Sequence, residues 1–414
     1  MRESADIIVS TNKYRNKKVL FVPDSIWGDL SGHRSSKYLV NAFDKSGIEI
    51  GIYASKLNYS PEQESDFKNK IKFYEKTEYS YVHNIFPSTL KKEFDNILDD
   101  FKPDYVFYMG TIKNKVSINL CIKRRIKYSY LPLTTEYYCV KDFAGLEDGP
   151  CFQCISSPFT SPLKNNCLGS KTNLPRYFKE IFFTYISKKR ILNADKVIGY
   201  SNNQLDYLKK FGVSSKKTLL MPIFFDPETI NGIESSNGDY FVMAGQHITA
   251  KGWHLIPRII KKGKGIKYKL VMRNEDQAKA FIKDNNLEEY VDNGEVEIVL
   301  YLKTHKELLE LVANSKGVLV PSYYATTGEF YLMEALGMGK PVIVFDAGIH
   351  KEVIQHKQNG MISKVGNLDS FYRNIIEVND NKNLQNKLSE GAVSLFNSLL
   401  SYKTFKDSLN DYFF

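Results

Sequence analysis

Short apolar runs alternate with longer amphipathic stretches along most of the chain. The first run is Lys18–Pro23 (KVLFVP), and apolar residues then recur at helical spacing from Tyr38 to Phe43 before Gly47 ends the pattern. Runs of four to six apolar residues are typical of strands that are buried on both faces. The pattern predicts five further strands before residue 225, at 48–54, 105–109, 128–133, 196–200 and 219–221.

A second series of the same kind follows a polar stretch, Asp226–Asp239 (DPETINGIESSNGD), which is typical of a linker. Its predicted strands are 240–244, 269–272, 296–300, 317–321, 341–345 and 361–363. Strands that alternate with helices predict a parallel sheet with helices on both faces. We therefore expect an α/β chain with two doubly wound, Rossmann-like domains that face each other across a cleft.

The expected domain bounds follow from these two series. The first domain spans residues 1–225 and carries a cysteine-containing loop insertion at 137–170, and the second spans 238–399. Residues 400–414 predict a last helix, for which packing back on the first domain is left open. Ligands of such sheets bind at the carboxyl ends of the strands, so the cleft is the expected site.

Composition narrows the class of protein. The 414 residues are 43% hydrophobic and 25% charged, which excludes wholesale disorder and a collagen-like chain. The 57 basic and 47 acidic residues give a net charge of +10, which favours an anionic partner unless it reflects general compositional drift. No apolar run reaches the roughly 18 residues that span a bilayer. We expect a cytoplasmic protein, with membrane association as the alternative.

The most informative segment is 321–352 (PSYYATTGEFYLMEALGMGKPVIVFDAGIHKE). A strand ends at Pro321, Gly328 lets the backbone approach a ligand closely, and a helix is predicted to begin near Glu329. The free amides and the dipole of a helix start favour phosphate. Glu334 lies in the second turn, where a carboxylate can accept hydrogen bonds from ribose hydroxyls; the alternative is an ordinary surface pair.

Residues 334–343 (EALGMGKPVI) resemble the EAxxxGxPVI signature of group 1 (family 4) retaining glycosyltransferases, which have the two-domain GT-B fold. Four further segments resemble family elements in the same order, and the resemblance covers nearly the whole chain. These segments are Lys102–Asp104, Ala194–Ser201, Gly245–Gly252 and Phe345–Glu352.

The resemblance implies roles for several residues. Lys251 would neutralise the donor diphosphate, Glu334 would hold the donor ribose, and Gly328, Glu329 and Phe330 would contact phosphate or sugar through their backbone amides. Gly245 and Gln246 belong to the loop that opens the donor domain. Gly32 matches a small-residue turn near donor and acceptor, and the adjacent His33 is either an acceptor-side base or a capping residue.

Three positions depart from the family pattern. Thr326 stands where the first Glu of the family's Glu-x7-Glu pair contacts the transferred sugar, and Glu329 lies near it in a different register. Gln246 replaces an Arg, with His247 as a candidate substitute. Thr135 and Glu136 replace a His-Asp pair on the acceptor side. These changes leave the expected fold intact but bear on catalysis and on the identity of the donor.

Four cysteines cluster in the predicted insertion with the spacing C-x11-C-x2-C-x12-C. They are Cys139, Cys151, Cys154 and Cys167. Four thiolates in a loop-rich segment can bind one structural zinc ion, and the alternative is a set of ordinary or redox-sensitive thiols.

The expected activity is transfer of a sugar from a UDP- or GDP-linked donor to a hydroxyl of a glycan or lipid-linked acceptor, in the synthesis of surface polysaccharide or a glycoconjugate. The resemblance implies a hexosyltransferase-like enzyme with retention of configuration and no catalytic metal. Two rivals remain: a GT-B partner protein that binds a sugar nucleotide without transfer, and a GT-B enzyme of another reaction, such as an epimerase. Dispersed lysines without a nucleic-acid motif argue against nucleic-acid binding; a peripheral membrane contact is left open.

Overall fold

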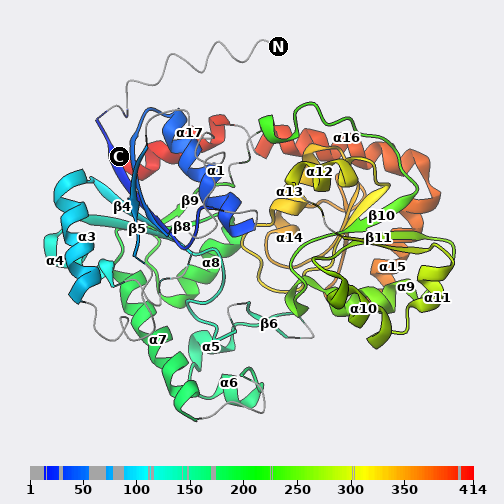
Figure 1. Ribbon diagram of the computed structural model, residues 1–414, viewed down its shortest axis with the longest axis horizontal. Coiled ribbons are helices and arrows are strands. Elements are labelled where there is room, and N and C mark those ends of the chain that lie inside the picture. The colour runs from blue at the N-terminus through cyan, green and yellow to red at the C-terminus, as the bar shows by residue number, and fades with distance from the viewer. Residues whose placement is uncertain are drawn as a thin grey trace. The chain divides into compact units, whose positions relative to one another are not determined.

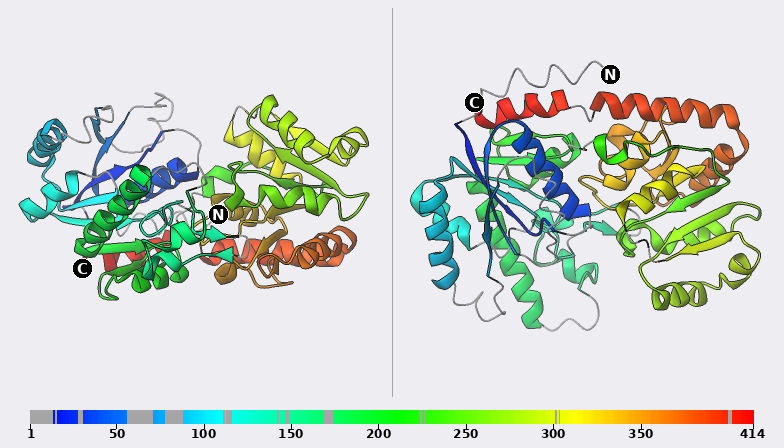
Figure 2. Two further views of the ribbon diagram at one scale, coloured as in Figure 1. Left: turned by 90° about the horizontal axis from the view of Figure 1, so that it is seen from below. Right: turned by 45° about the horizontal axis from the view of Figure 1, so that its top comes forward.

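The computed structural model describes residues 14, 16–27, 31–55, 71–77, 88–110, 112, 116–141, 143–146, 149–168, 174–223, 225, 227–300, 302, 304–399 and 402–414. The chain forms two compact units, which Figures 1 and 2 show from three directions. The first unit comprises Met1–Asp142, Phe152–Phe224 and Tyr402–Phe414, and the second comprises Phe143–Cys151 and Phe225–Ser401.

The first unit contains a seven-stranded sheet in the order β3-β2-β1-β4-β5-β8-β9, in which every neighbouring pair is parallel. Its strands are β1 (Lys18–Pro23), β2 (Glu49–Ala54), β3 (Lys72–Glu75), β4 (Tyr105–Met109), β5 (Lys127–Leu131), β8 (Lys196–Gly199) and β9 (Thr218–Leu220). The predicted parallel sheet is confirmed. The sequence pattern missed β3, whose four residues are all at least partly exposed at the edge of the sheet.

Helices cover both faces of this sheet (Figure 1). Phe21 of β1 packs against Phe43 of α1, while its neighbour Leu20 lies on the opposite face beside Phe101 of α3. The helices of the unit are α1 (Ser31–Lys45), α3 (Ser88–Phe101), α4 (Ser117–Arg124), α5 (Gln153–Ser156), α6 (Ser161–Lys164), α7 (Leu174–Asn193), α8 (Asn202–Phe211) and α17 (Tyr402–Phe413).

The C-terminal helix α17 belongs to the first unit although the chain reaches it from the second. The ring of Tyr412 packs edge-on against Phe43 of α1 at 5.7 Å, and its hydroxyl lies 2.7 Å from Ser129 Oγ on β5. The Tyr14 hydroxyl donates a hydrogen bond to Asn410 at 2.6 Å. This buried aromatic contact fixes the end of the chain against the first sheet.

The second unit contains a six-stranded parallel sheet in the order β12-β11-β10-β13-β14-β15. Its strands are β10 (Tyr240–Met243), β11 (Lys267–Val271), β12 (Val296–Val299), β13 (Gly317–Val320), β14 (Val342–Phe345) and β15 (Met361–Ser363). Its α-helices are α9 (Ile256–Ile260), α10 (Glu275–Asp284), α11 (Glu288–Asp292), α12 (His305–Ala313), α13 (Phe330–Gly337), α14 (His350–Val353), α15 (Leu368–Asp380) and α16 (Lys382–Leu399), and its 3-10 turns are η2 (Pro227–Ile230), η3 (Thr249–Lys251) and η4 (Trp253–Leu255).

Different helices pack on the two faces of this sheet. On one face, α9, α10 and α15 bury a continuous apolar core that includes Trp253, Phe281 and Phe371. On the other face, α13 packs against β13, α12 and α16 (Figure 1). Helix α13 is buried almost all round, from Phe330 to Leu336, so polar groups on it need partners inside the protein.

The predicted linker is attached to the second unit over its second half. Ser235 Oγ donates hydrogen bonds to the carbonyls of Ala313 and Met338, at 3.2 and 3.1 Å. The buried ammonium of Lys340 donates to the carbonyls of Ser236 and Ser315. Burial lowers the pKa of Lys340 to about 8. The polar stretch that was predicted as a linker is therefore an ordered segment that is hydrogen-bonded to this unit.

A short hairpin from the cysteine-containing segment also packs on the second unit. It consists of β6 (Gly145–Leu146) and β7 (Gly149–Pro150), which pair antiparallel. The ring of Phe143 meets that of Tyr324 edge-on at 5.3 Å, and the Ala325 amide donates to the Ala144 carbonyl at 3.4 Å. The segment predicted as a single insertion at 137–170 is thus divided between the units, since residues from Phe152 return to the first.

Among the described residues, no helix combines the length and the apolar character that a bilayer crossing requires.

Candidate active site

Lys251 ends η3, in the loop that follows β10. The next residue, Gly252, has φ +80°, and a Cβ there would collide with the carbonyl oxygen of Pro321. Only glycine combines that conformation with so close an approach. The turn therefore brings Lys251 to the end of β13, where the segment between Pro321 and Glu329 leads into α13.

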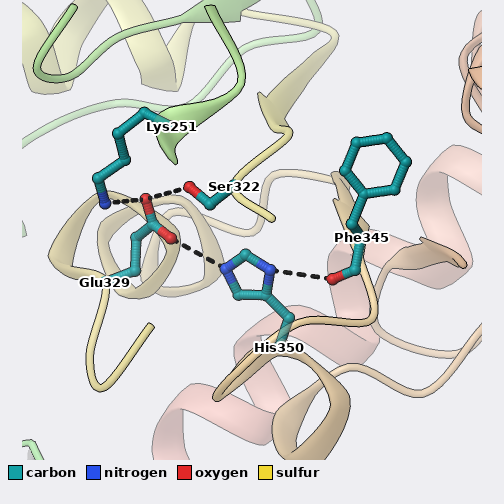
Figure 3. A network of polar contacts seen from close by, with 5 residues as sticks. All are labelled: Lys251, Ser322, Glu329, Phe345 and His350. Carbon is teal, nitrogen blue, oxygen red and sulfur yellow. Dashed lines mark hydrogen bonds and ion pairs between the residues drawn. The ribbon is translucent and has the colours of Figure 1, made fainter. Parts of the chain in front are cut away.

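Glu329 is the centre of a buried polar network (Figure 3). The Lys251 ammonium donates to its Oε1 at 2.6 Å, and Ser322 Oγ donates to the same oxygen at 3.1 Å. His350 Nε2 lies 2.9 Å from Oε2, and His350 Nδ1 lies 3.0 Å from the carbonyl oxygen of Phe345. Both ring nitrogens of His350 therefore face oxygen atoms, and an N–H on either nitrogen is donated within the network.

The charges of the network reinforce each other. Burial alone would raise the pKa of Glu329, but the Lys251 ammonium and the hydrogen bond from His350 outweigh it and lower that pKa to about 2. Burial alone would lower the pKa of Lys251, but the Glu329 carboxylate outweighs it and raises that pKa. Lys251 is therefore a permanent cation at neutral pH, which is the state that an anionic ligand requires.

Tyr324 gives Lys251 a second contact. The ammonium lies over the Tyr324 ring, 5.4 Å from its centroid, and the same ring is held by Phe143 of the hairpin. Gly145 of β6 lies so close to Tyr324 that a Cβ there would be 3.1 Å from its side chain. The hairpin thus supports the aromatic surface on which Lys251 rests.

Glu334 lies one turn further along α13, as predicted, and is fully buried. Its Oε1 is 3.0 Å from Nε2 of His305, the first residue of α12, and the two form an ion pair when the imidazole is protonated. Neither His305 nor His350 was singled out from the sequence. The position of His305, directly after the helix-capping Thr304, does not indicate from the sequence that it pairs with a residue of α13.

Thr326 does not join the network around Glu329. Its Oγ1 is buried and has no hydrogen-bond partner among the described residues, whereas its carbonyl accepts from the Ile349 amide at 3.1 Å. Gly348, with φ +52°, packs against the Thr326 backbone so closely that any side chain would collide. The half-buried Gly328 follows, and Phe330 begins α13 with Glu329 at the N-cap position.

The loop before Lys251 contains Gln246, which replaces the family's Arg, and His247, its candidate substitute. Gly245 and Gln246 are exposed, and Gly245 has φ +123°. His247 packs against the rings of Trp253 and Phe281, with centroids at 4.7 and 5.2 Å, and burial lowers its pKa. His247 is therefore a poor source of positive charge at neutral pH and does not substitute for the Arg that Gln246 replaces.

The candidates of the first unit lie on α1 and in the loop after β5. Gly32 is in the first turn of α1, where a Cβ would be 3.9 Å from the Leu133 side chain. His33 follows it and is half-buried. The buried carboxylate of Glu136 accepts a hydrogen bond from the Ile112 amide at 2.9 Å. This bond gives Glu136 a structural role in holding the loop after β4.

The predicted zinc site is not supported by the described residues. No group of three or more His, Cys, Asp or Glu residues in the described parts of the chain, which include Cys139, Cys151, Cys154 and Cys167, is arranged to hold a metal ion. Cys139 and Cys154 are buried, whereas Cys151 and Cys167 are partly exposed, and Cys151 belongs to the second unit.

Comparison with known proteins supports the sequence resemblance. Residues 228–394 match the model of the family described as glycosyl transferases group 1. This part of the chain is similar to the donor domain of group 1 glycosyltransferases. The matched range contains Lys251, Glu329, Glu334 and both histidines that pair with the carboxylates. No curated protein sequence matches the chain.

Solved structures share the fold of the whole chain. Sucrose-phosphate synthase from Thermosynechococcus elongatus has a TM-score of 0.67 at 13% identity, covering 96% of this chain and 98% of its own. HepE from Anabaena scores 0.67 at 12% identity over 95% and 98%. TarM from S. aureus scores 0.68 at 12% identity over 96% and 100%. These similarities confirm the predicted GT-B fold.

Proposed function

We propose that the protein transfers a sugar from a nucleotide-sugar donor to a hydroxyl of a glycan or lipid-linked acceptor, and that the donor binds at the Lys251 end of the second sheet. The observation that carries the proposal is the buried ammonium of Lys251, which Glu329 holds while His350 and Ser322 contact the same carboxylate. It lies at the carboxyl end of β13 and the start of α13, where parallel sheets of this kind bind phosphate.

The cluster fits the chemistry of a leaving nucleoside diphosphate. As the bond between sugar and phosphate breaks, negative charge develops on the diphosphate, and a preorganised cation stabilises it. Lys251 has three N–H groups, of which Glu329 takes one at 2.6 Å and Tyr324 lies beside another, so one remains for a phosphate oxygen. We propose that Glu329 holds Lys251 in place and that transfer proceeds without a catalytic metal.

Glu334 is suited to bind the ribose of the donor. A buried carboxylate five residues after Glu329 can accept two hydrogen bonds from vicinal hydroxyls. Its partner His305 fixes one oxygen at 3.0 Å, which orients the carboxylate. A donor with a ribose is in keeping with the fold's neighbours, since HepE structures contain UDP-glucose or UDP and glucose, and a TarM structure contains UDP with fondaparinux and α-GlcNAc-glycerol.

Retention of the anomeric configuration, the glycan or lipid-linked acceptor and a role in polysaccharide or glycoconjugate synthesis complete the proposal. They rest on the group 1 signature at residues 334–343. Product anomericity, read by NMR once a donor is known, tests retention; an inverted product overturns it.

The direct test of function is release of nucleoside diphosphate from a panel of UDP-, GDP-, ADP- and dTDP-sugars, with and without candidate acceptors. We expect slow release from one donor, and faster release when the right acceptor is present. Binding of a donor without any release, with or without acceptors, would instead support a partner protein that binds sugar nucleotides. This second function, binding without transfer, is supported by one observation. The Thr326 hydroxyl, at the family's sugar-contacting position, has no hydrogen-bond partner among the described residues.

A further inference from the structure

The outward face of α7 is aromatic. Phe178, Phe182 and Tyr185 are 61%, 59% and 68% exposed, which are high values for such large side chains. Their spacing of four and three residues places them on one stripe of the helix, and Lys189 continues that stripe.

The buried face of the same helix contains Tyr177, Ile181 and Ile191 but also two polar residues. It includes Thr184 and Ser187, whose hydroxyls donate to the carbonyls of Glu180 and Phe183 at 2.9 and 2.7 Å. An ordinary surface helix has its apolar residues inward and its polar residues outward. Helix α7 departs from that arrangement, so its outward aromatic rings are not explained by the packing of the first unit.

The short helix α6 extends the patch. Phe159, just before α6, and Leu163 within it are 59% and 61% exposed. Figures 1 and 2 show α6 beside the N-terminal end of α7. Of the eight large hydrophobic side chains that are exposed among the described residues, these two and the three of α7 form the aromatic face; the others are Ile122, Val393 and Phe414.

The aromatic face has a basic border. Between residues 159 and 189 the sequence has six Lys or Arg residues and one acid, Glu180. Lys164 and Lys189 are exposed, and Lys179 and Lys188 are partly exposed. Exposed aromatic rings flanked by lysines are the combination by which helices bind the surface of an anionic bilayer, because rings enter the headgroup region while the lysines meet the phosphates.

We propose that the face formed by Phe159, Leu163, Phe178, Phe182 and Tyr185 binds the surface of an anionic phospholipid membrane. The helix would lie along the bilayer, with its lysine stems extended toward the headgroups. The basic border favours this occupant over an uncharged apolar partner. The inference goes beyond the transfer reaction and stands without it, because none of these residues belongs to the candidate active site.

Vesicle flotation of the full chain tests the proposal. One set of vesicles is phosphatidylcholine alone, and the other contains about one third phosphatidylglycerol. We expect binding to the anionic vesicles that weakens as salt is raised. The triple variant F178S/F182S/Y185S should bind these vesicles at least about tenfold more weakly, because it loses the inserted rings. The variant K164E/K189E should bind more weakly and with less dependence on salt.

The matched control is I122S/V393S, which removes exposed apolar side chains elsewhere on the chain and should bind as the wild type does. Circular dichroism and release of nucleoside diphosphate from a soluble donor check that each variant is folded. Equal flotation of the triple variant and the wild type would overturn the proposal. So would self-association of the wild type without vesicle binding, detected by sedimentation velocity and lost in the triple variant, since a second copy would then cover the face.

Discussion

Two buried carboxylates, Glu329 and Glu334, lie five residues apart at the start of α13 and are compensated in different ways. Glu329 receives an ammonium, an imidazole and a hydroxyl, so both of its oxygens have partners. Glu334 has an imidazole, that of His305, on one oxygen. The first carboxylate therefore holds a cation in place, whereas the second pairs with the histidine that begins α12. We infer that one serves the diphosphate through Lys251 and the other serves the ribose directly.

Removal of the cation should have the largest effect. We expect K251A to lower kcat for donor turnover by about 10²–10³-fold, because one preorganised charge at a leaving group has about this value. Glu329 keeps its contacts with His350 and Ser322, so the variant should fold. The control is K264A, which removes an exposed lysine of the same unit and should turn over donor at the wild-type rate. Comparable kcat values for K251A and K264A would refute the assignment.

Neutralising Glu329 should change how the free energy of unfolding depends on pH in the acid range. The pKa of this carboxyl is about 2 in the folded protein and about 4.5 when unfolded. Its stabilising contribution is thus complete above pH 4.5 and is lost as the pH falls toward 2, with a total of about 3 kcal/mol. We expect the difference in unfolding free energy between the wild type and E329Q, from urea titrations, to shrink over this window. A difference that is constant with pH would contradict the ion pair.

Changing Glu334 should affect donor affinity more than stability. We expect E334Q to raise the KM for the donor by about 10–50-fold, since an amide accepts hydrogen bonds at one atom instead of two. H305A should raise the KM less, because it removes the group that orients the carboxylate and leaves the carboxylate itself. Steady-state kinetics compare the two, and a larger effect for H305A than for E334Q would reverse their proposed roles.

The smallest effect is expected at Thr326. Its Oγ1 makes no hydrogen bond in the described structure, so T326V should change the unfolding free energy by less than about 0.5 kcal/mol. If Glu329 has taken over the charged role at this end of the helix, donor turnover by T326V should stay within about twofold of the wild type. A large loss of kcat would show instead that the Thr326 hydroxyl contacts the transferred sugar.

The sequence predicted most of the fold because buried parallel strands are continuous apolar runs. Strands such as Lys18–Pro23 and Tyr105–Met109 have the bounds that the pattern predicted. Strand β3 was missed because KFYE at the sheet edge has no buried run. The outward stripe of α7 could not be predicted, since helical spacing gives a stripe but not the direction in which it faces.

The candidate site was predicted only in part. Lys251 and Glu334 followed from the family signature, but the pairing of Lys251 with Glu329 joins residues 78 positions apart. The roles of His350 and His305 could not be predicted, because the function of a single histidine depends on the side chains that the fold places beside it. The cysteine spacing suggested metal, whereas the structure divides those residues between two units.

The most direct test of the central claim compares the binding of a nucleoside with that of its diphosphate, by isothermal titration, once the donor base is known. The wild type should bind the diphosphate far more tightly than the nucleoside, because Lys251 meets the phosphates. K251A should lose most of this difference, whereas E334Q should weaken both ligands and keep it. An unchanged difference in K251A would show that the diphosphate binds elsewhere and would contradict the account.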